Sequence, residues 1–266
     1  MKTILRRLLP FLSAAWLWAA SAAPAAEPAA TIAERGPHHR IWHWTTSEDW
    51  PGGARLARQH RVVELATGMH YWAGGQWIES QELIEPFPDG AVARHGPHKA
   101  IFAPNLNTRE AIDLEMPDGQ RLRSHILGLA YTDSASAKNV LIAEIKDCVG
   151  EILPPNQVLY RDAFNDIKAT VRYTYTRVGL EQDVLLHQAP PSPALFGLNP
   201  ATTRLEVYTE FSEPPQPAKS MVLLSQQTDP AVRPTLGLPD FTDETLDVGS
   251  MHIGQGHAFP SGDDDA

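Results

Sequence analysis

The sequence predicts an all-β protein, an antiparallel β-sandwich-like domain built from hairpins and meanders with long Pro-rich loops. From Arg61 onward, short runs rich in β-branched and aromatic residues alternate with Gly, Pro, Asn and Asp. After residue 25, no window repeats apolar residues at helical spacing over three turns. The 23 prolines, nearly twice the ordinary share of about 5%, concentrate between the runs.

The first residues predict a secretory signal peptide over 1–25. Three basic residues precede an apolar run over 8–20, and an A-x-A motif follows at Ala20–Ala22. An uncleaved membrane anchor is the alternative, but the run is shorter than the ~20 apolar residues that span a bilayer. We therefore expect an exported chain, secreted or held in the periplasm or at the cell surface, with no membrane span after signal removal.

The charge of the chain limits its expected partners, and its cysteine content limits its covalent cross-links. The expected signal holds three of the 22 basic residues and none of the 32 acidic ones, which leaves a net formal charge of −13 on the rest. Such a chain repels phosphate backbones, so we expect no nucleic-acid partner. Cys148 is the only cysteine. No intramolecular disulfide can form, and a buried, inert thiol is the favoured interpretation.

Individual strands follow from alternation. The clearest covers 167–176, where odd positions are apolar or aromatic and even positions are Lys, Thr or Arg. A turn at Val178–Gly179 leads into 180–186, which predicts a meander. Two continuous apolar runs, 126–131 and 140–145, predict central strands with both faces covered.

Glycine pairs mark the hairpins. Gly74–Gly75 can supply the positive φ angles of a two-residue turn. Asp89–Gly90 and Asp118–Gly119 predict two further turns, and alternation ahead of the second predicts that Ile112 and Leu114 are buried.

All tryptophan outside the expected signal lies between positions 42 and 77. The Gly74–Gly75 turn pairs Trp72 with Trp77 across two strands. The favoured interpretation is that this pair stabilises the hairpin by burying apolar area. The alternative is that Trp72 and Trp77 form an exposed, coplanar platform that stacks on sugar rings.

Composition shifts divide the chain into four parts. After the signal at 1–25, residues 26–58 predict a flexible leader, without fixed structure to Ala33, and a Trp-rich entry segment. Residues 59–212 predict the antiparallel β domain. Residues 213–266 predict a Pro-rich linker and the start of a further β segment or an extended tail.

Several stretches resemble the uncharacterised N-terminal regions of large secreted bacterial surface proteins that carry RHS/YD-type or other repeats downstream. The pattern is a tyrosine and short loop before an alternating strand, then a glycine turn and an acidic strand, here 158–173 and 179–184. The pieces 64–72, 102–107 and 198–203 also look like those regions. The resemblance implies a β-sandwich-like module and no known catalytic residues.

Candidate chemistry is sparse, and no cofactor or metal is expected. The 11 histidines fit no metal motif and are interpreted as scattered surface or loop residues. Glu181 and Asp183 share a strand face, which suits a glycosidase pair, but an exposed face opposite Lys168 and Arg172 explains them more simply. Asp263–Asp265 is interpreted as a solvated tail rather than a calcium loop.

The sequence thus predicts an exported structural or adhesive β module without catalytic activity. Its expected partners are other cell-surface or extracellular proteins, or glycans. The first alternative is a carbohydrate-binding module that uses Trp72 and Trp77. The second is an extracellular hydrolase with no recognisable motif.

Overall fold

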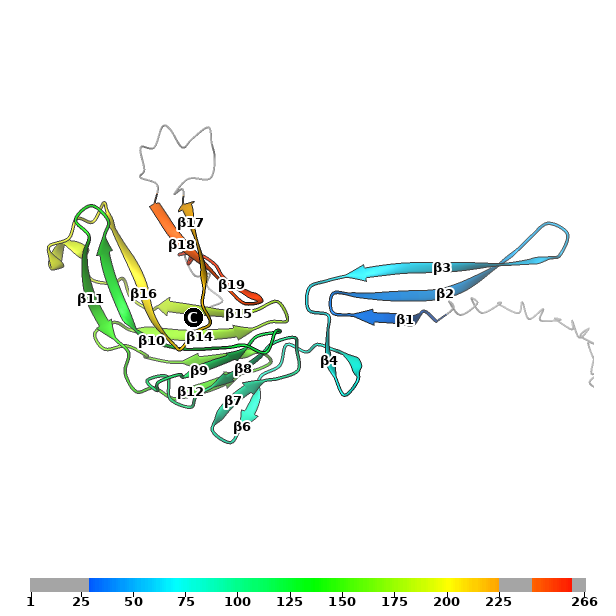
Figure 1. Cartoon of the computed structure of the whole chain (residues 1–266), viewed down its shortest axis with the longest axis horizontal. Coiled ribbons are helices and arrows are strands. Elements are labelled where there is room, and N and C mark those ends of the chain that lie inside the picture. Colours follow the sequence, from blue (N-terminus) through cyan, green and yellow to red (C-terminus); the bar gives the residue numbers. More distant parts are fainter. Residues whose placement is uncertain (1–28, 225–240, 260–266) are drawn as a thin grey trace, which may run out of the picture.

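A computed structural model describes residues 29–224 and 241–259, nearly all of them in antiparallel strands or their connections (Figure 1). This confirms the predicted all-β, sandwich-like class. The expected signal peptide and the Asp263–Asp265 tail lie outside the described residues.

Two facing sheets form the body of the molecule. The first contains β6 (Glu85–Phe87), β7 (Gly90–Ala93), β8 (Lys99–Phe102), β9 (Ile112–Glu115), β10 (Arg121–Asp133), β11 (Lys138–Glu144) and β16 (Thr203–Ser212). The second contains β12 (Gly150–Leu153), β13 (Gln157–Tyr160), β14 (Ala169–Tyr175) and β15 (Leu180–Leu186). A 3₁₀ turn, η1 (Pro193–Phe196), lies between β15 and β16. The two sheets bury one continuous apolar core between them.

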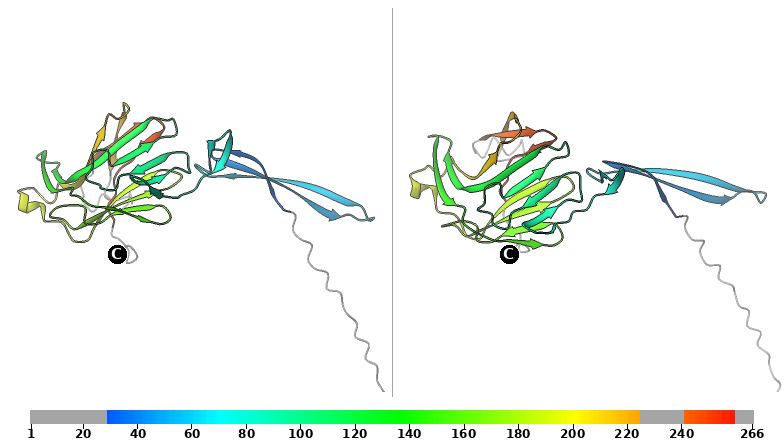
Figure 2. Two further views of the ribbon diagram at one scale, coloured as in Figure 1. Left: turned by 90° about the horizontal axis from the view of Figure 1, so that it is seen from below. Right: turned by 60° about the horizontal axis from the view of Figure 1, so that its bottom comes forward.

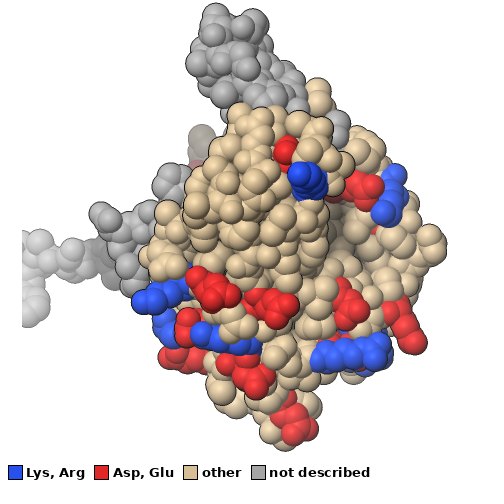
Figure 3. Space-filling view, turned by 90° about the vertical axis from the view of Figure 1, so that its left-hand side faces the viewer, with Lys and Arg blue, Asp and Glu red and all other residues tan. Residues whose placement is uncertain are grey.

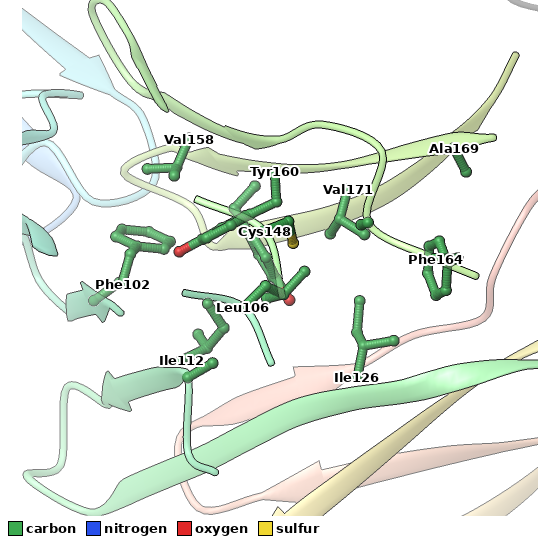
Figure 4. Close-up of a cluster of buried hydrophobic side chains, with 14 of the residues drawn as sticks. Phe102, Leu106, Ile112, Ile126, Cys148, Val158, Tyr160, Phe164, Ala169 and Val171 are labelled. Carbon is green, nitrogen blue, oxygen red and sulfur yellow. The ribbon is translucent and has the colours of Figure 1, made fainter. Parts of the chain in front are cut away.

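The core interlocks side chains from both sheets (Figure 4). Phe102 and Ile126 come from the first sheet, and Tyr160 and Val171 come from the second. The Tyr160 hydroxyl donates to the carbonyl of Ala103 at 2.6 Å, so a buried polar atom also joins the layers.

Alternation in β14 is confirmed. Ala169, Val171, Tyr173 and Tyr175 are all buried, and β15 pairs with β14 along its full length, which gives the predicted meander. The odd positions face the core because successive side chains of a strand point to opposite faces.

The glycine turns are confirmed at two positions and wrong at one. Gly74 and Gly75 have φ of +58° and +79°, and the β9–β10 hairpin turns through Gly119. By contrast, Pro88 and Asp89 form the other turn, and Gly90 already pairs with Phe87 inside the hairpin. Gly90 serves close packing instead, since a Cβ there would lie 2.0 Å from the carbonyl oxygen of Phe102.

The prediction that 126–131 and 140–145 have both faces covered is wrong in part. Leu127 and Leu141 are 42% and 45% exposed. Leu127 is the extra residue of a bulge against β16, and bulge residues leave the regular alternation. Leu141 lies on β11, which pairs only with β10 among the described strands. A continuous apolar run in the sequence indicates neither the bulge nor the single neighbour of β11.

A third sheet projects from the body as an arm, residues 31–65, formed by β1 (Thr31–Gly36), β2 (His39–Asp49) and β3 (Arg55–Leu65). Figure 1 and the two views of Figure 2 show it extending away from the two facing sheets. The expected absence of structure up to Ala33 is therefore wrong for 31–33, and the predicted boundary at 58/59 falls within β3. Pairing of β2 with β3 over 11 residue pairs explains why the segment is ordered.

Two smaller sheets complete the fold. The hairpin β4 (His70–Ala73) and β5 (Gln76–Glu79) lies where the arm meets the body. The strands β17 (Ala218–Leu224), β18 (Phe241–Val248) and β19 (Met251–Ile253) form a sheet anchored by Val248 in the core and by Ser250, whose backbone N–H donates to Asp118 at 3.0 Å.

Asp133 closes the β10–β11 turn and gives a pH prediction. Its carboxylate accepts hydrogen bonds from the hydroxyls of Ser136 and Thr202 and from the backbone of Ala135, which lowers its pKa from 3.8 to about 2. Its stabilising effect is therefore complete above about pH 4 and lost as the pH falls toward 2.

We expect Asp133→Asn to reduce the fall in the free energy of unfolding between pH 4 and pH 2, as measured by urea unfolding, whereas Asp89→Asn on an exposed turn should not. Equal acid profiles for Asp133→Asn and the wild-type chain would contradict this role.

Candidate binding surface

One face of the arm carries most of its aromatic side chains. Directly paired residues share a face, so the even-numbered residues of β2 and β3 lie together. We call this surface the Trp face; it consists of Ile32, Arg35, Arg40, Trp42, Trp44, Thr46, Glu48, Leu56, Arg58, His60, Val62 and Glu64. No other layer of the described chain forms a sandwich with it.

Two neighbouring residue pairs in the middle of the Trp face, Trp42–Val62 and Trp44–His60, carry no carboxylate or arginine. Trp44 stacks on His60 with ring centroids 5.0 Å apart and an interplanar angle of 9°. Thr46 Oγ1 is hydrogen-bonded to His60 Nε2 at 2.7 Å, which fixes the orientation of the imidazole. Val62 lies beside these rings and is 47% exposed. The middle therefore presents flat, oriented rings and an aliphatic side chain to the surroundings.

The end of the Trp face near the body is a polar cluster. Arg40 donates twice to Glu64, at 2.5 and 3.0 Å, and Trp42 Nε1 donates to the same carboxylate at 2.9 Å. The Arg40 guanidinium also lies 5.0 Å from the centre of the Trp42 ring. The hydrogen bonds from Arg40, then from Trp42, lower the pKa of Glu64 to about 2. Glu64 thus stays ionised near neutral pH and acts as an orienting group.

The β4–β5 hairpin continues this surface toward the body. Arg40 contacts Glu79 at 3.1 Å, and Glu79 shares a face of β5 with Trp77. Trp72 pairs with Trp77 as predicted, and Trp72 is 60% exposed. Their rings meet edge-to-face at 73°, with centroids 5.2 Å apart. They are not coplanar, so a sugar could stack on the exposed Trp72 ring but not on a two-ring platform.

Hydrogen bonds fix the joint between arm and body. Buried His70 donates from Nδ1 to the Gly36 carbonyl at 2.8 Å, and the Gly68 N–H donates to His38 Nδ1 at 3.0 Å. Gly68 has φ of +65°, and a Cβ there would lie 2.2 Å from the carbonyl oxygen of Arg177. The arm is therefore held by its base at a defined place on the body.

The other candidate residues have structural explanations. Asp183 pairs with Arg172 at 3.1 Å on the outer face of the second sheet, as the simpler interpretation predicted. Cys148 is buried, and burial raises its pKa.

The interpretation of the histidines as surface or loop residues is wrong for His70 and His98, which are both buried. The His98 ring centroid lies 4.8 Å from that of Tyr175, and desolvation lowers the pKa of His98. In 29–224 and 241–259, no three metal-ligating side chains cluster.

A depression of about 230 Å³ opens between the two body sheets beside Phe102 and Tyr160. It is smaller than usual ligand pockets. Its one ionisable group is the Tyr160 hydroxyl, which already donates to Ala103. The residues that line this depression therefore provide no free group for proton transfer.

Figure 3 shows the end of the body on the side away from the arm. Acidic and basic side chains lie intermixed in a band, and the area above the band carries few charges. This end presents no continuous basic patch.

Comparisons with family models, curated proteins and solved structures gave no match. Among the residues that the structure describes, no helix has the length and apolar character needed to cross a membrane.

Sequence reasoning found part of the surface. It located the tryptophan-rich region and the Trp72–Trp77 pair, but it did not find the Trp face. The signal was present, because Trp42 and Trp44 alternate with His43 and Thr45 across a run of ordinary strand length. That alternation places both tryptophans on one side.

Proposed function

We propose that this chain is an exported, non-catalytic structural or adhesive β module of the bacterial cell surface, and that the Trp face is its contact surface. The N-terminal sequence pattern supports export. The resemblance to N-terminal regions of large surface proteins supports the location.

One observation carries the choice of surface. Stable sheets bury an apolar face against a second layer, and sheets of three or more strands need a hydrophobic face for independent stability. Both faces of the three-stranded arm expose apolar side chains, but only the Trp face combines them, at Val62 and Leu56, with strand tryptophans. A partner that covers this face supplies the missing layer.

The polar groups of this face suit recognition. Arg40, Glu64 and Trp42 Nε1 fix one another, so their remaining donors and acceptors hold defined directions before a partner arrives. Preorganised groups of this kind reduce the entropy lost on binding. With its pKa near 2, Glu64 is a poor general acid at neutral pH.

Binding of the purified chain to envelope fractions of the source cells tests the proposal. We expect saturable binding, with the native chain recovered from the envelope by an antibody to residues after Glu64. A chain that remains cytoplasmic, or that shows no saturable binding to any envelope fraction, would contradict the proposal.

Carbohydrate binding at Trp72 is a second candidate, favoured by the 60% exposure of that ring. Sugar titrations followed by tryptophan fluorescence test it. Trp72→Ala should remove the response if this ring stacks on the sugar, whereas a response that survives this substitution excludes the site.

A further inference from the structure

The Trp face offers a footprint of the size that a weak protein–protein contact covers. Strands β2 and β3 have 11 residues and β1 has six, which at about 3.3 Å per residue gives lengths of roughly 36 Å and roughly 20 Å, and each strand adds about 4.8 Å of width. One face therefore measures roughly 440 Å², and two such faces in contact bury roughly 900 Å². That total is the size of a weak or transient interface, below the roughly 1,200 Å² at which stable complexes begin.

We propose that the missing layer is the Trp face of a second copy of this chain. The two arms pack face to face about a two-fold axis that crosses the strands at the level of Trp44 and His60, so they run antiparallel and the two bodies lie at opposite ends. This inference rests on the proposed function, because it takes the Trp face as the contact surface and names its partner.

The distribution of charge favours contact through the arm. Residues 31–65 carry five arginines and four carboxylates, a formal charge of +1, whereas residues 66–266 carry 14 basic and 27 acidic residues, a formal charge of −13. Two bodies therefore repel each other, and two arms do not. Antiparallel arms keep the bodies apart, whereas parallel arms place them side by side.

The face is also complementary to itself in this orientation, as an isologous interface requires. Arg40 and Glu48 lie on the same face of β2, each four residues from Trp44 and on opposite sides of it. Rotation about the proposed axis places Arg40 of one copy over Glu48 of the other, twice per dimer. Trp44 and His60, which lie at the axis, meet their own counterparts, and aromatic contacts of this kind dominate many interfaces. The same rotation places Val62 of one copy over Arg58 of the other.

Sedimentation of the exported, purified full chain over a range of concentrations tests the inference with a matched pair of variants. Glu48 lies on the Trp face and pairs with Arg58 at 3.8 Å; Asp49 lies on the opposite face and pairs with Arg55 at 3.2 Å. Glu48→Arg should weaken the dimer at least tenfold, since it sets arginine against arginine. Asp49→Arg makes the same charge change and should leave the dimer within twofold of wild type.

A second pair guards against an effect on the arm itself. Val62 and Val63 are adjacent and similarly exposed, at 47% and 43%, but they point to opposite faces. Val62→Arg sets a second arginine over Arg58 of the other copy and should weaken the dimer at least tenfold, whereas Val63→Arg should not. Near-UV circular dichroism confirms that both variants are folded.

A wild-type chain that stays monomeric at every concentration would overturn the inference, as would a dimer that both members of each pair weaken equally or leave intact. A monomeric chain that still binds envelope fractions through the Trp face would overturn the dimer alone. Loss of saturable envelope binding would instead contradict the proposed function.

Discussion

Replacing Tyr160 with alanine is expected to destabilise the sandwich by about 3–5 kcal/mol, the cost of deleting a large buried aromatic side chain. Tyr160 is fully buried, packs 6.1 Å from Tyr173 between ring centroids, and donates to the Ala103 carbonyl at 2.6 Å. The substitution leaves a cavity and an unsatisfied carbonyl between the two sheets.

Urea unfolding followed by near-UV circular dichroism measures this loss. Val149→Ala is the control, because Val149 is 78% exposed and such changes usually fall within about 0.5 kcal/mol. Tyr160→Phe should lie between the two, since it keeps the ring and removes the hydrogen bond. A loss below about 1 kcal/mol for Tyr160→Ala would show that Tyr160 does not join the layers.

Replacing Trp42 and Trp44 together with alanine is expected to weaken binding to envelope fractions by at least about 30-fold, because buried tryptophans at interface centres contribute about 2 kcal/mol or more. The variant removes the stack on His60 and one donor to Glu64. The body should unfold at the wild-type urea concentration, since neither tryptophan belongs to its core.

The double variant His43→Ala with Thr45→Ala is the matched control for this measurement. These residues alternate with the two tryptophans and point to the opposite face of β2. If the control weakened envelope binding as much as the tryptophan variant, the effect would come from the arm as a whole, and the assignment of the Trp face would be wrong.

Much of the body could be predicted from sequence because local rules decide it. The alternation in β14 determined which side chains face the core, and Gly74–Gly75 set the register that pairs Trp72 with Trp77. The predictions for Leu127 and Gly90 were wrong because tertiary contacts decide their roles. A bulge against β16 exposes Leu127, and the close approach of β8 requires glycine at position 90.

The arm shows where a composition-based argument fails. Alanine and proline up to Ala33 indicated a flexible leader, and the tryptophans after it indicated an entry segment rather than a sheet. Strands β2 and β3 are polar because both faces of the arm lie outside the body. The sequence of a strand that is exposed on both faces contains fewer apolar residues than that of a strand with one face against a core. The Trp face was therefore hidden, although its period of two was present in the sequence.

Hydroxyl-radical footprinting of the chain, bound to envelope fractions and free in dilute solution, tests the central claim most directly. The account predicts that binding protects Trp42, Trp44 and Val62 from oxidation, while Leu141 and Leu205, exposed on the body, react equally in both states. Protection of the body residues, with Trp42 and Trp44 oxidised equally in both states, would contradict the assignment of the contact surface.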